Sequence, residues 1–396
     1  MGSQLLGLEE WFAPLDLAEF RRKVLGQQLV VLPPRPELAD RLVKDLALGS
    51  IDDLLRLRGA KVYAWFQKLD GSQTAAIVPA VAGRRLYEAG TTLYFRGILE
   101  FGAQEREVAK HFGVPPSSVE CTLFCNRPSA RTRAHFDTAD IFSIQLRGRK
   151  TWRIAPNEFA PAPLRNWATL HPLAPELRQY ADGLPPTEMP ENATSYTLEK
   201  GGILHMPRGY WHDTFSDEDS LSLHIQIASP SRAEILLSML KNELAREQWW
   251  REPAYDLKPE DPGAIERAMV ACSRLREATS RLDAHDLVQR ATESRNVDAT
   301  TRFVRSGQAG FGIGSLDPQT DTAQIEITSY EYHRSTVSRL DMSMVFVRGC
   351  QWINALATGG AFDARQVQKA ASGLELHEAQ DLLGLLEQTR FIRRQD

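Results

Sequence analysis

From residue 119 to residue 229, apolar residues occur in short runs that Gly, Pro and Asn separate. The runs are VECTLFCN, DIFSIQLRG, KTWRIAP, SYTLEKGG, ILHMP and LSLHIQIAS. Short apolar runs with regular turn signals between them are typical of strands in an all-β barrel or a double-sheet roll. We therefore predict a β-barrel or a double sheet for this part of the chain.

The segment before this β-region has a different pattern. Apolar residues recur at helical spacing over residues 15–25 and 36–48, and the apolar run at 27–34 between them ends in two prolines. This pattern predicts two helices with a short buried strand between them. A further helix is predicted to end at the Gly and Pro residues of 113–116. We expect these elements to pack on the barrel.

Two further units follow the β-region. Residues 232–292 have apolar residues three and four apart, which predicts amphipathic helices. Beyond them we predict strands near 322–330 and 342–347, helices at 364–372 and 376–389, and a last strand at 390–394. Helices followed by a short β-element suggest a winged-helix module. The predicted units are therefore 1–230, the barrel with its N-terminal helical segment; 231–295, a helical region; and 296–396, a winged-helix domain.

The composition is that of a folded protein, with 42% hydrophobic and 25% charged residues. A formal charge of -4 gives no electrostatic footprint for nucleic acid or an anionic membrane, so we expect direct binding to neither. The four cysteines form no CxxC pair, so neither a zinc ribbon nor a disulfide framework is indicated. Without a run of 18 apolar residues, we expect no membrane span and a cytoplasmic protein.

The candidate chemistry begins in AHFDTADIFSIQLRGRK at residues 134–150. His135 and Asp137 are two residues apart, and on a strand both side chains leave the same face. His212 follows a Gly-Gly turn and a proline in GGILHMPRGYWHD, where a turn can present a third ligand at a strand end. Two histidines and one carboxylate leave three adjacent metal positions open, which is the arrangement of non-haem Fe(II) oxygenases.

Lys150 lies fifteen residues after His135, a spacing that can place its cation across the barrel from the metal. An enzyme that uses 2-oxoglutarate needs such a cation, because the distal carboxylate leaves water while the 2-oxo acid end chelates the iron. His205 and His224 are rival third ligands. For these two histidines we favour roles in which they contact the metal ligands or the substrate without binding the metal.

At these residues the chain resembles the JmjC oxygenases of the cupin superfamily, and within them the ribosomal-protein hydroxylases. The matching text is AHFDTADIFSIQLRGRKTWRI and YTLEKGGILHMPRGYWHDTFSDEDSLSLHIQIASP, and a weaker resemblance extends over the later regions. The resemblance implies a mixed α and β fold: a double-stranded β-helix (the cupin or JmjC jelly roll), then a helical dimerisation region and a C-terminal winged-helix domain that does not read DNA. It also implies a homodimer.

By this resemblance His135, Asp137 and His212 bind Fe(II), and Lys150 holds the distal carboxylate of 2-oxoglutarate. Thr132 occupies the place where related oxygenases have a hydroxyl that assists the same carboxylate. Ser222 stands where some relatives keep an asparagine, and we expect it in the co-substrate pocket.

The resemblance implies an Fe(II)- and 2-oxoglutarate-dependent dioxygenase that uses O₂ to hydroxylate a side chain of a protein substrate. An Arg or a His of a ribosomal protein is the leading expectation. Hydroxylation of a peptide natural product precursor is the alternative, because the long insertion at residues 156–200 departs from the family. An alternative from another class is a non-catalytic cupin that serves as a protein-interaction module. The three ligand types and Lys150 argue against that reading, since a binding module needs no anion partner beside a metal.

Overall fold

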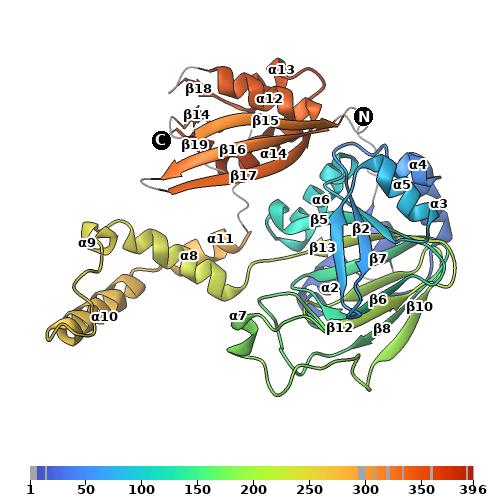
Figure 1. The fold of residues 1–396 in the computed structure, drawn as a ribbon, viewed down its shortest axis with the longest axis horizontal. Coiled ribbons are helices and arrows are strands. Elements are labelled where there is room, and N and C mark those ends of the chain that lie inside the picture. The colour runs from blue at the N-terminus through green and yellow to red at the C-terminus, as the bar shows by residue number, and fades with distance from the viewer. Residues whose placement is uncertain are drawn as a thin grey trace.

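Two antiparallel sheets form the centre of the protein (Figure 1). The computed structural model describes residues 7–13, 16–292, 300–306, 309–317, 322–331, 334–356, 360–388 and 391–395. The larger sheet has the order β1-β11-β7-β13-β5-β4-β2-β3, and the smaller has the order β10-β8-β12-β6-β9. The strands of the larger sheet are β1 (Val30–Leu32), β2 (Lys61–Gln67), β3 (Gln73–Ile77), β4 (Leu93–Arg96), β5 (Val119–Asn126), β7 (Asp140–Arg147), β11 (Ile203–Met206) and β13 (Ser220–Ile227).

The smaller sheet consists of β6 (Arg131–Phe136), β8 (Lys150–Ala155), β9 (Trp167–Ala168), β10 (Thr194–Leu198) and β12 (Trp211–Phe215). The predicted double sheet is confirmed, and each apolar run from 119 to 229 contains a strand. The sequence pattern did not indicate β2, β3 and β9. Strands β2 and β3 extend the larger sheet beyond the barrel at one edge.

Alternation along β13 separates two environments. Leu221, Leu223 and Ile225 lie in a core on the outer face of the larger sheet, together with side chains from the N-terminal helices. Ser222 and His224 alternate with them and point into the space between the two sheets, where His224 meets Trp152 of β8. A strand buried on both faces with polar residues on one of them marks a polar interior.

The helical segment before the barrel covers the outer face of the larger sheet, as predicted. Phe20 and Phe112 pack on Phe142 of β7, with ring centroids 5.7 and 5.5 Å away. The helices are α1 (Leu8–Phe12), α2 (Leu17–Lys23), α3 (Pro36–Asp45), α4 (Ile51–Leu54), α5 (Ala80–Glu88) and α6 (Gly102–Phe112). Gly113, with φ +64°, ends α6 in the left-handed conformation that glycine adopts readily. A short helix, α7 (Pro175–Arg178), lies in the long insertion.

The helical region that follows extends away from the barrel (Figure 1). It consists of α8 (Arg232–Leu244), α9 (Gln248–Arg251), α10 (Ala264–Ser280) and α11 (Ala284–Thr292). Helix α8 begins at a capping box. The Ser231 hydroxyl accepts a hydrogen bond from the Glu234 amide, and the Glu234 carboxylate accepts one from the Ser231 amide. The predicted boundary between residues 295 and 296 lies outside the described residues.

The described residues of the C-terminal unit form two small sheets and three helices. One sheet has the order β15-β16-β17 and the other β18-β14-β19. The elements are β14 (Phe303–Arg305), β15 (Ala309–Asp317), β16 (Thr322–Glu331), β17 (Arg334–Ser343), α12 (Met344–Ala355), β18 (Ala361–Phe362), α13 (Ala364–Ala370), α14 (Leu376–Gln388) and β19 (Ile392–Arg394). The helices agree with the prediction as far as they are described, since Thr389 and Arg390 lie outside the described residues. The winged-helix assignment stays a prediction.

The strand predicted at residues 342–347 is wrong. Strand β17 ends at Ser343 and helix α12 begins at Met344. Val347, Cys350 and Ile353 are buried at helical spacing. The run MSMVFV is apolar except for Ser343, so its pattern does not distinguish a buried strand from the first turn of a buried helix.

Ion pairs connect the C-terminal unit to the helices around the barrel. Arg106 of α6 contacts Asp381 of α14 at 3.0 Å, and Arg58 lies 3.8 Å from Glu378. Within the described residues, no helix has the length and apolarity needed to cross a membrane.

Candidate functional site

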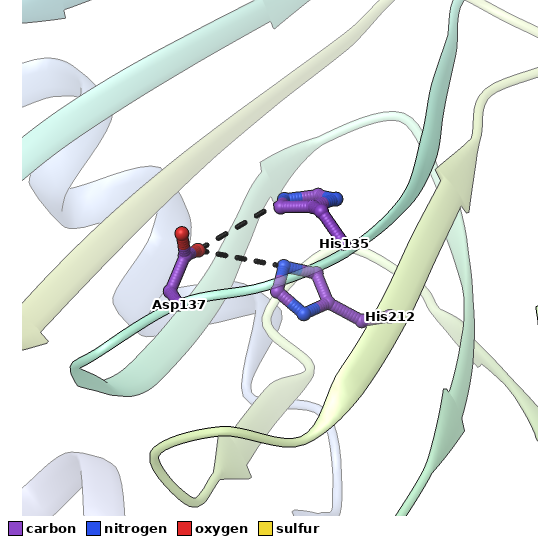
Figure 2. A group of neighbouring side chains, drawn as sticks. All are labelled: His135, Asp137 and His212. Atoms are coloured by element: carbon purple, nitrogen blue, oxygen red, sulfur yellow. Dashed lines mark ion pairs between the residues drawn. The ribbon is translucent and has the colours of Figure 1, made fainter. Parts of the chain in front are cut away.

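The three predicted metal ligands lie together at one end of the barrel interior (Figure 2). His135 is on β6, His212 is on the paired strand β12, and Asp137 lies one residue beyond the end of β6. One ligand atom of each residue falls within 4.8 Å of the other two. The Oδ2 of Asp137 is 3.9 Å from Nε2 of His135 and 3.6 Å from Nε2 of His212. The side chains therefore converge on one point.

Backbone carbonyls orient both imidazoles in the same way. The Nδ1 of His135 lies 2.7 Å from the Arg133 carbonyl oxygen, and the Nδ1 of His212 lies 3.1 Å from the Tyr210 carbonyl oxygen. Because a carbonyl only accepts, each Nδ1 carries the hydrogen and each Nε2 keeps a free lone pair. This is how histidines that bind metal through Nε2 are usually held.

The site is buried on one side and open on the other. His212 is 3% exposed, whereas the side chains of His135 and Asp137 are 21% and 27% exposed. Burial, and then the neighbouring His135, hold the pKa of His212 well below its usual value, so its imidazole is neutral near pH 7. A neutral imidazole is the form that binds metal.

A tight turn before β12 holds the backbone of Asp137 in place. The Gly209 amide donates to the Asp137 carbonyl oxygen at 2.9 Å. Gly209 has φ +86°, and a Cβ there would lie 2.4 Å from Cδ of Pro163. Only glycine fits this close approach without strain. The Pro-Arg-Gly sequence therefore has a structural role next to the ligands.

A β-bulge in β6 lies between Thr132 and His135. His212 pairs with His135 and Thr214 pairs with Thr132, so β6 has one more residue than β12 between the two pairs. The Thr132 hydroxyl is 2.8 Å from the Thr214 hydroxyl and accepts from the Thr214 amide at 3.0 Å. Sequence reasoning missed Thr214, the immediate partner of this hydroxyl.

Lys150 is fully inside the barrel, with 2% exposure. Its Nζ lies 5.2 Å from the ring centroid of Phe124 and 5.1 Å from that of Trp152. Trp152 in turn packs on the ring of His212, with centroids 5.7 Å apart. Burial lowers the pKa of Lys150 to about 7, and no carboxylate of the described residues offsets this effect.

Ser222 and the two rival histidines have different surroundings. The Ser222 hydroxyl is fully buried and donates to Oε1 of Gln145 at 2.9 Å. His205 points to the outer face, where its ring packs on Phe20 at 5.0 Å and its Nδ1 meets the Gln28 carbonyl. A substrate-facing role for His205 is therefore wrong, because β11 turns Leu204 and Met206 inward instead. His224 does face the interior.

Several buried polar atoms of the interior have no hydrogen-bond partner among the described residues. They belong to Thr122, Asn126, Ser143, Trp152 and His224. Buried polar groups are nearly always paired, so such a cluster indicates that something else supplies the partners. The signal in the sequence is the alternation of polar and apolar residues, which is complete in β13, SLSLHIQI. Strand β5 shows it at Thr122 and Asn126, with Phe124 between them on the same face.

Comparison with known proteins assigns the barrel region. The family model described as JmjC domain matches residues 107–235, which include all three clustered ligands and Lys150. The chain contains a JmjC domain. The resemblance seen in the sequence is thereby confirmed.

The chain is also similar to individual proteins. The uncharacterized protein YxbC of Bacillus subtilis is 28% identical over 258 residues, which are 62% of this chain and 78% of that protein. Ribosomal oxygenase 1 of Gallus gallus is 27% identical over 124 residues, which are 31% of this chain and only 18% of that protein. A structure of YcfD, a ribosomal oxygenase from Escherichia coli, in complex with cobalt and 2-oxoglutarate is 15% identical; the match covers 97% of this chain and 99% of that one, with a TM-score of 0.44.

Proposed function

We propose that this JmjC protein is an Fe(II)- and 2-oxoglutarate-dependent dioxygenase that hydroxylates a side chain of a protein substrate. One observation carries the proposal. The cluster of His135, Asp137 and His212 shares the barrel interior with Lys150, a buried cation without a carboxylate partner among the described residues. A metal site and an anion site in one cavity fit a co-substrate that is both a chelator and a carboxylate.

The three clustered residues fit a ferrous ion. They supply two imidazole nitrogens and one carboxylate, and both Nε2 atoms are free because both Nδ1 atoms are bound. This donor set suits Fe(II) and leaves three positions open. When bound, Fe(II) with 2-oxoglutarate and O₂ supplies the oxidising power that converts a C–H bond of the substrate into C–OH, with succinate and CO₂ as the other products.

The residues of the chain have separate tasks in this reaction. His135, Asp137 and His212 hold the ion at the open end of the barrel. Lys150 pairs with the distal carboxylate and fixes the direction in which the co-substrate enters. The aromatic walls Phe124 and Trp152 exclude water from that carboxylate, which strengthens its attraction to Lys150.

For the substrate we propose an Arg or a His side chain of a ribosomal protein. The resemblance to ribosomal-protein hydroxylases and the name of the chicken relative, ribosomal oxygenase 1, support this class. The exposed sides of His135 and Asp137 leave the metal positions accessible to a polypeptide side chain.

We also propose that the protein is a homodimer. Large apolar side chains are exposed in the helical region that extends from the barrel, on α8, on α10 and in the connection between α9 and α10: Leu236, Leu237, Tyr255, Leu257, Ile265, Met269, Val270 and Leu275. Exposed apolar patches are typical of an interface. A second copy of the same helices would bury it through a symmetric contact.

Formation of succinate from 2-oxoglutarate in the presence of Fe(II) and O₂ tests the enzymatic proposal. Ribosomal proteins incubated with the complete system should gain the mass of one oxygen atom on an Arg or a His residue. Protein that binds Fe(II) but forms no succinate with or without ribosomal proteins would contradict the proposal.

A further inference from the structure

His224 has no role in the function proposed so far, yet its setting is unusual. The residue lies on β13 and is 5% exposed, and its Nε2 has no hydrogen-bond partner among the described residues. A buried polar atom without a partner is costly unless a ligand or water satisfies it. We therefore expect a ligand inside the barrel to form a hydrogen bond with Nε2 of His224.

Lys150 and His224 lie between the same two aromatic walls. The ring of His224 is 4.3 Å from that of Phe124 and 5.4 Å from that of Trp152. The Nζ of Lys150 is 5.2 and 5.1 Å from the same two rings. The ammonium group and the imidazole are thus neighbours in one compartment.

Hydroxyl groups flank this compartment on both sides of β13. His224 pairs with Thr122 of β5 and with Ser143 of β7. The hydroxyls of Thr122 and Ser143 are also buried without partners among the described residues. One cation and three neutral polar groups form a site for an anion, because no carboxylate of the described residues neutralises the cation.

The position of His224 indicates which end of an anion it meets. The imidazole of His224 and the ammonium group of Lys150 contact the same two rings, those of Phe124 and Trp152. Burial, then the charge of Lys150, then His212 lower the pKa of His224, so its imidazole is neutral. The 2-oxo acid end of the co-substrate would chelate the metal at the three clustered residues. The end that lies beside Lys150 is therefore the distal carboxylate.

We infer that His224 binds the distal carboxylate of 2-oxoglutarate together with Lys150, by donating the hydrogen on its Nε2 to a carboxylate oxygen. This inference rests on the proposed function. It names a co-substrate residue that the family resemblance did not supply, whereas the hydroxyls of Thr132 and Ser222 are already bonded to Thr214 and Gln145.

Two co-substrate probes distinguish this role from packing. 2-Oxopentanoate has the same 2-oxo acid end as 2-oxoglutarate but a methyl group in place of the distal carboxylate. Anaerobic titration of the Fe(II)-loaded protein with each probe, followed by the visible charge-transfer absorption of an iron-bound 2-oxo acid, gives both affinities. Metal affinity is measured separately.

The variants His224→Gln and His224→Met have side chains of similar length, and only glutamine offers an N–H donor. We expect His224→Met to bind 2-oxoglutarate about tenfold more weakly or worse than wild type, with His224→Gln between them. Both should bind 2-oxopentanoate and Fe(II) as wild type does. His205→Met removes a buried histidine from the outer face and should bind both probes normally.

Equal affinity of His224→Met and His224→Gln for 2-oxoglutarate would overturn the inference, as would an equal loss for both probes. A change in Fe(II) affinity would also overturn it, because His224 would then act on the metal end. If wild-type protein loaded with Fe(II) does not bind 2-oxoglutarate at all, the proposed function itself fails, and that result is distinguishable because it appears before any substitution.

Discussion

His135 and His212 lie directly opposite each other on the antiparallel strands β6 and β12, with ring centroids 4.0 Å apart. The register of one strand pair therefore determines whether the candidate metal site exists. A slip by one residue would turn one of the imidazoles to the other face of the sheet. The bulge between this pair and the pair Thr132 and Thr214 is part of the same register.

Asp137→Ala should abolish tight Fe(II) binding while the fold persists. The carboxylate is the only anionic ligand of the three, and its side chain is partly exposed, so its loss removes charge without opening a core. We expect Fe(II) affinity to fall at least tenfold, measured by metal content after equilibrium dialysis. Asp213→Ala is the control, because Asp213 follows His212 on β12 but pairs with Arg153 on the smaller sheet. Equal metal content in wild type and Asp137→Ala would refute the assignment.

Lys150→Met should make the ligand-free protein more stable near pH 7. Folding lowers the pKa of Lys150 from 10.5 to about 7, so between these values the unfolded chain binds more protons than the folded one. Stability therefore rises with pH across this window in wild type. Methionine has no charge to bury, and we expect a gain of roughly 2–4 kcal/mol at pH 7 that shrinks towards pH 9.5. Urea unfolding at several pH values measures the difference.

The same substitution should weaken the binding of 2-oxoglutarate. Lys150→Met is expected to bind Fe(II) normally and 2-oxoglutarate at least tenfold more weakly, because the buried carboxylate loses its cation. A stabilised variant with poor binding is the usual signature of a functional residue that is strained by burial. Wild-type affinity for 2-oxoglutarate in Lys150→Met would show that the cation serves another purpose.

The sequence predicted the pair of His135 and Asp137 and the double sheet because both depend on local spacing, whereas the choice of His212 depended on the family resemblance. His135 and Asp137 are two residues apart, and the strands alternate with turn signals. The direction of His205 could not be predicted. Strand β11, ILHM, is buried on both faces, so its apolar residues do not reveal which face the N-terminal helices cover. Strand β13 alternates polar and apolar residues, and this pattern places His224 on the same face as Ser222. The bonding of Thr132 likewise depends on a bulge that no spacing rule indicates.

Gly209→Ala should damage the metal site through the backbone. A Cβ at φ +86° would be strained and would lie 2.4 Å from Cδ of Pro163, and any shift would disturb the bond from the Gly209 amide to Asp137. We expect a loss of roughly 1–3 kcal/mol in stability and weaker Fe(II) binding. Gly183→Ala is the matched control, since Gly183 has φ +71° but no atom within 4 Å of the added Cβ. If both variants kept wild-type metal affinity, the turn would not be a support for Asp137.

Ile265→Glu with Met269→Glu should separate the proposed dimer. The two side chains are 76% and 67% exposed and lie one turn apart on α10, so a second copy would bury both in one contact. Two carboxylates in an apolar interface cost far more than on a free surface. Light scattering after size exclusion should give twice 44.5 kDa for wild type and 44.5 kDa for the variant.

The control for this experiment is Leu184→Glu, which adds a charge at an apolar residue that is 92% exposed and distant in sequence from the helices. It should remain dimeric, because it changes the net charge without touching α10. A wild type of 44.5 kDa at all concentrations would contradict the dimer. The variant should keep its Fe(II) affinity in either case, since the three ligands come from β6, its following residue and β12 of a single chain.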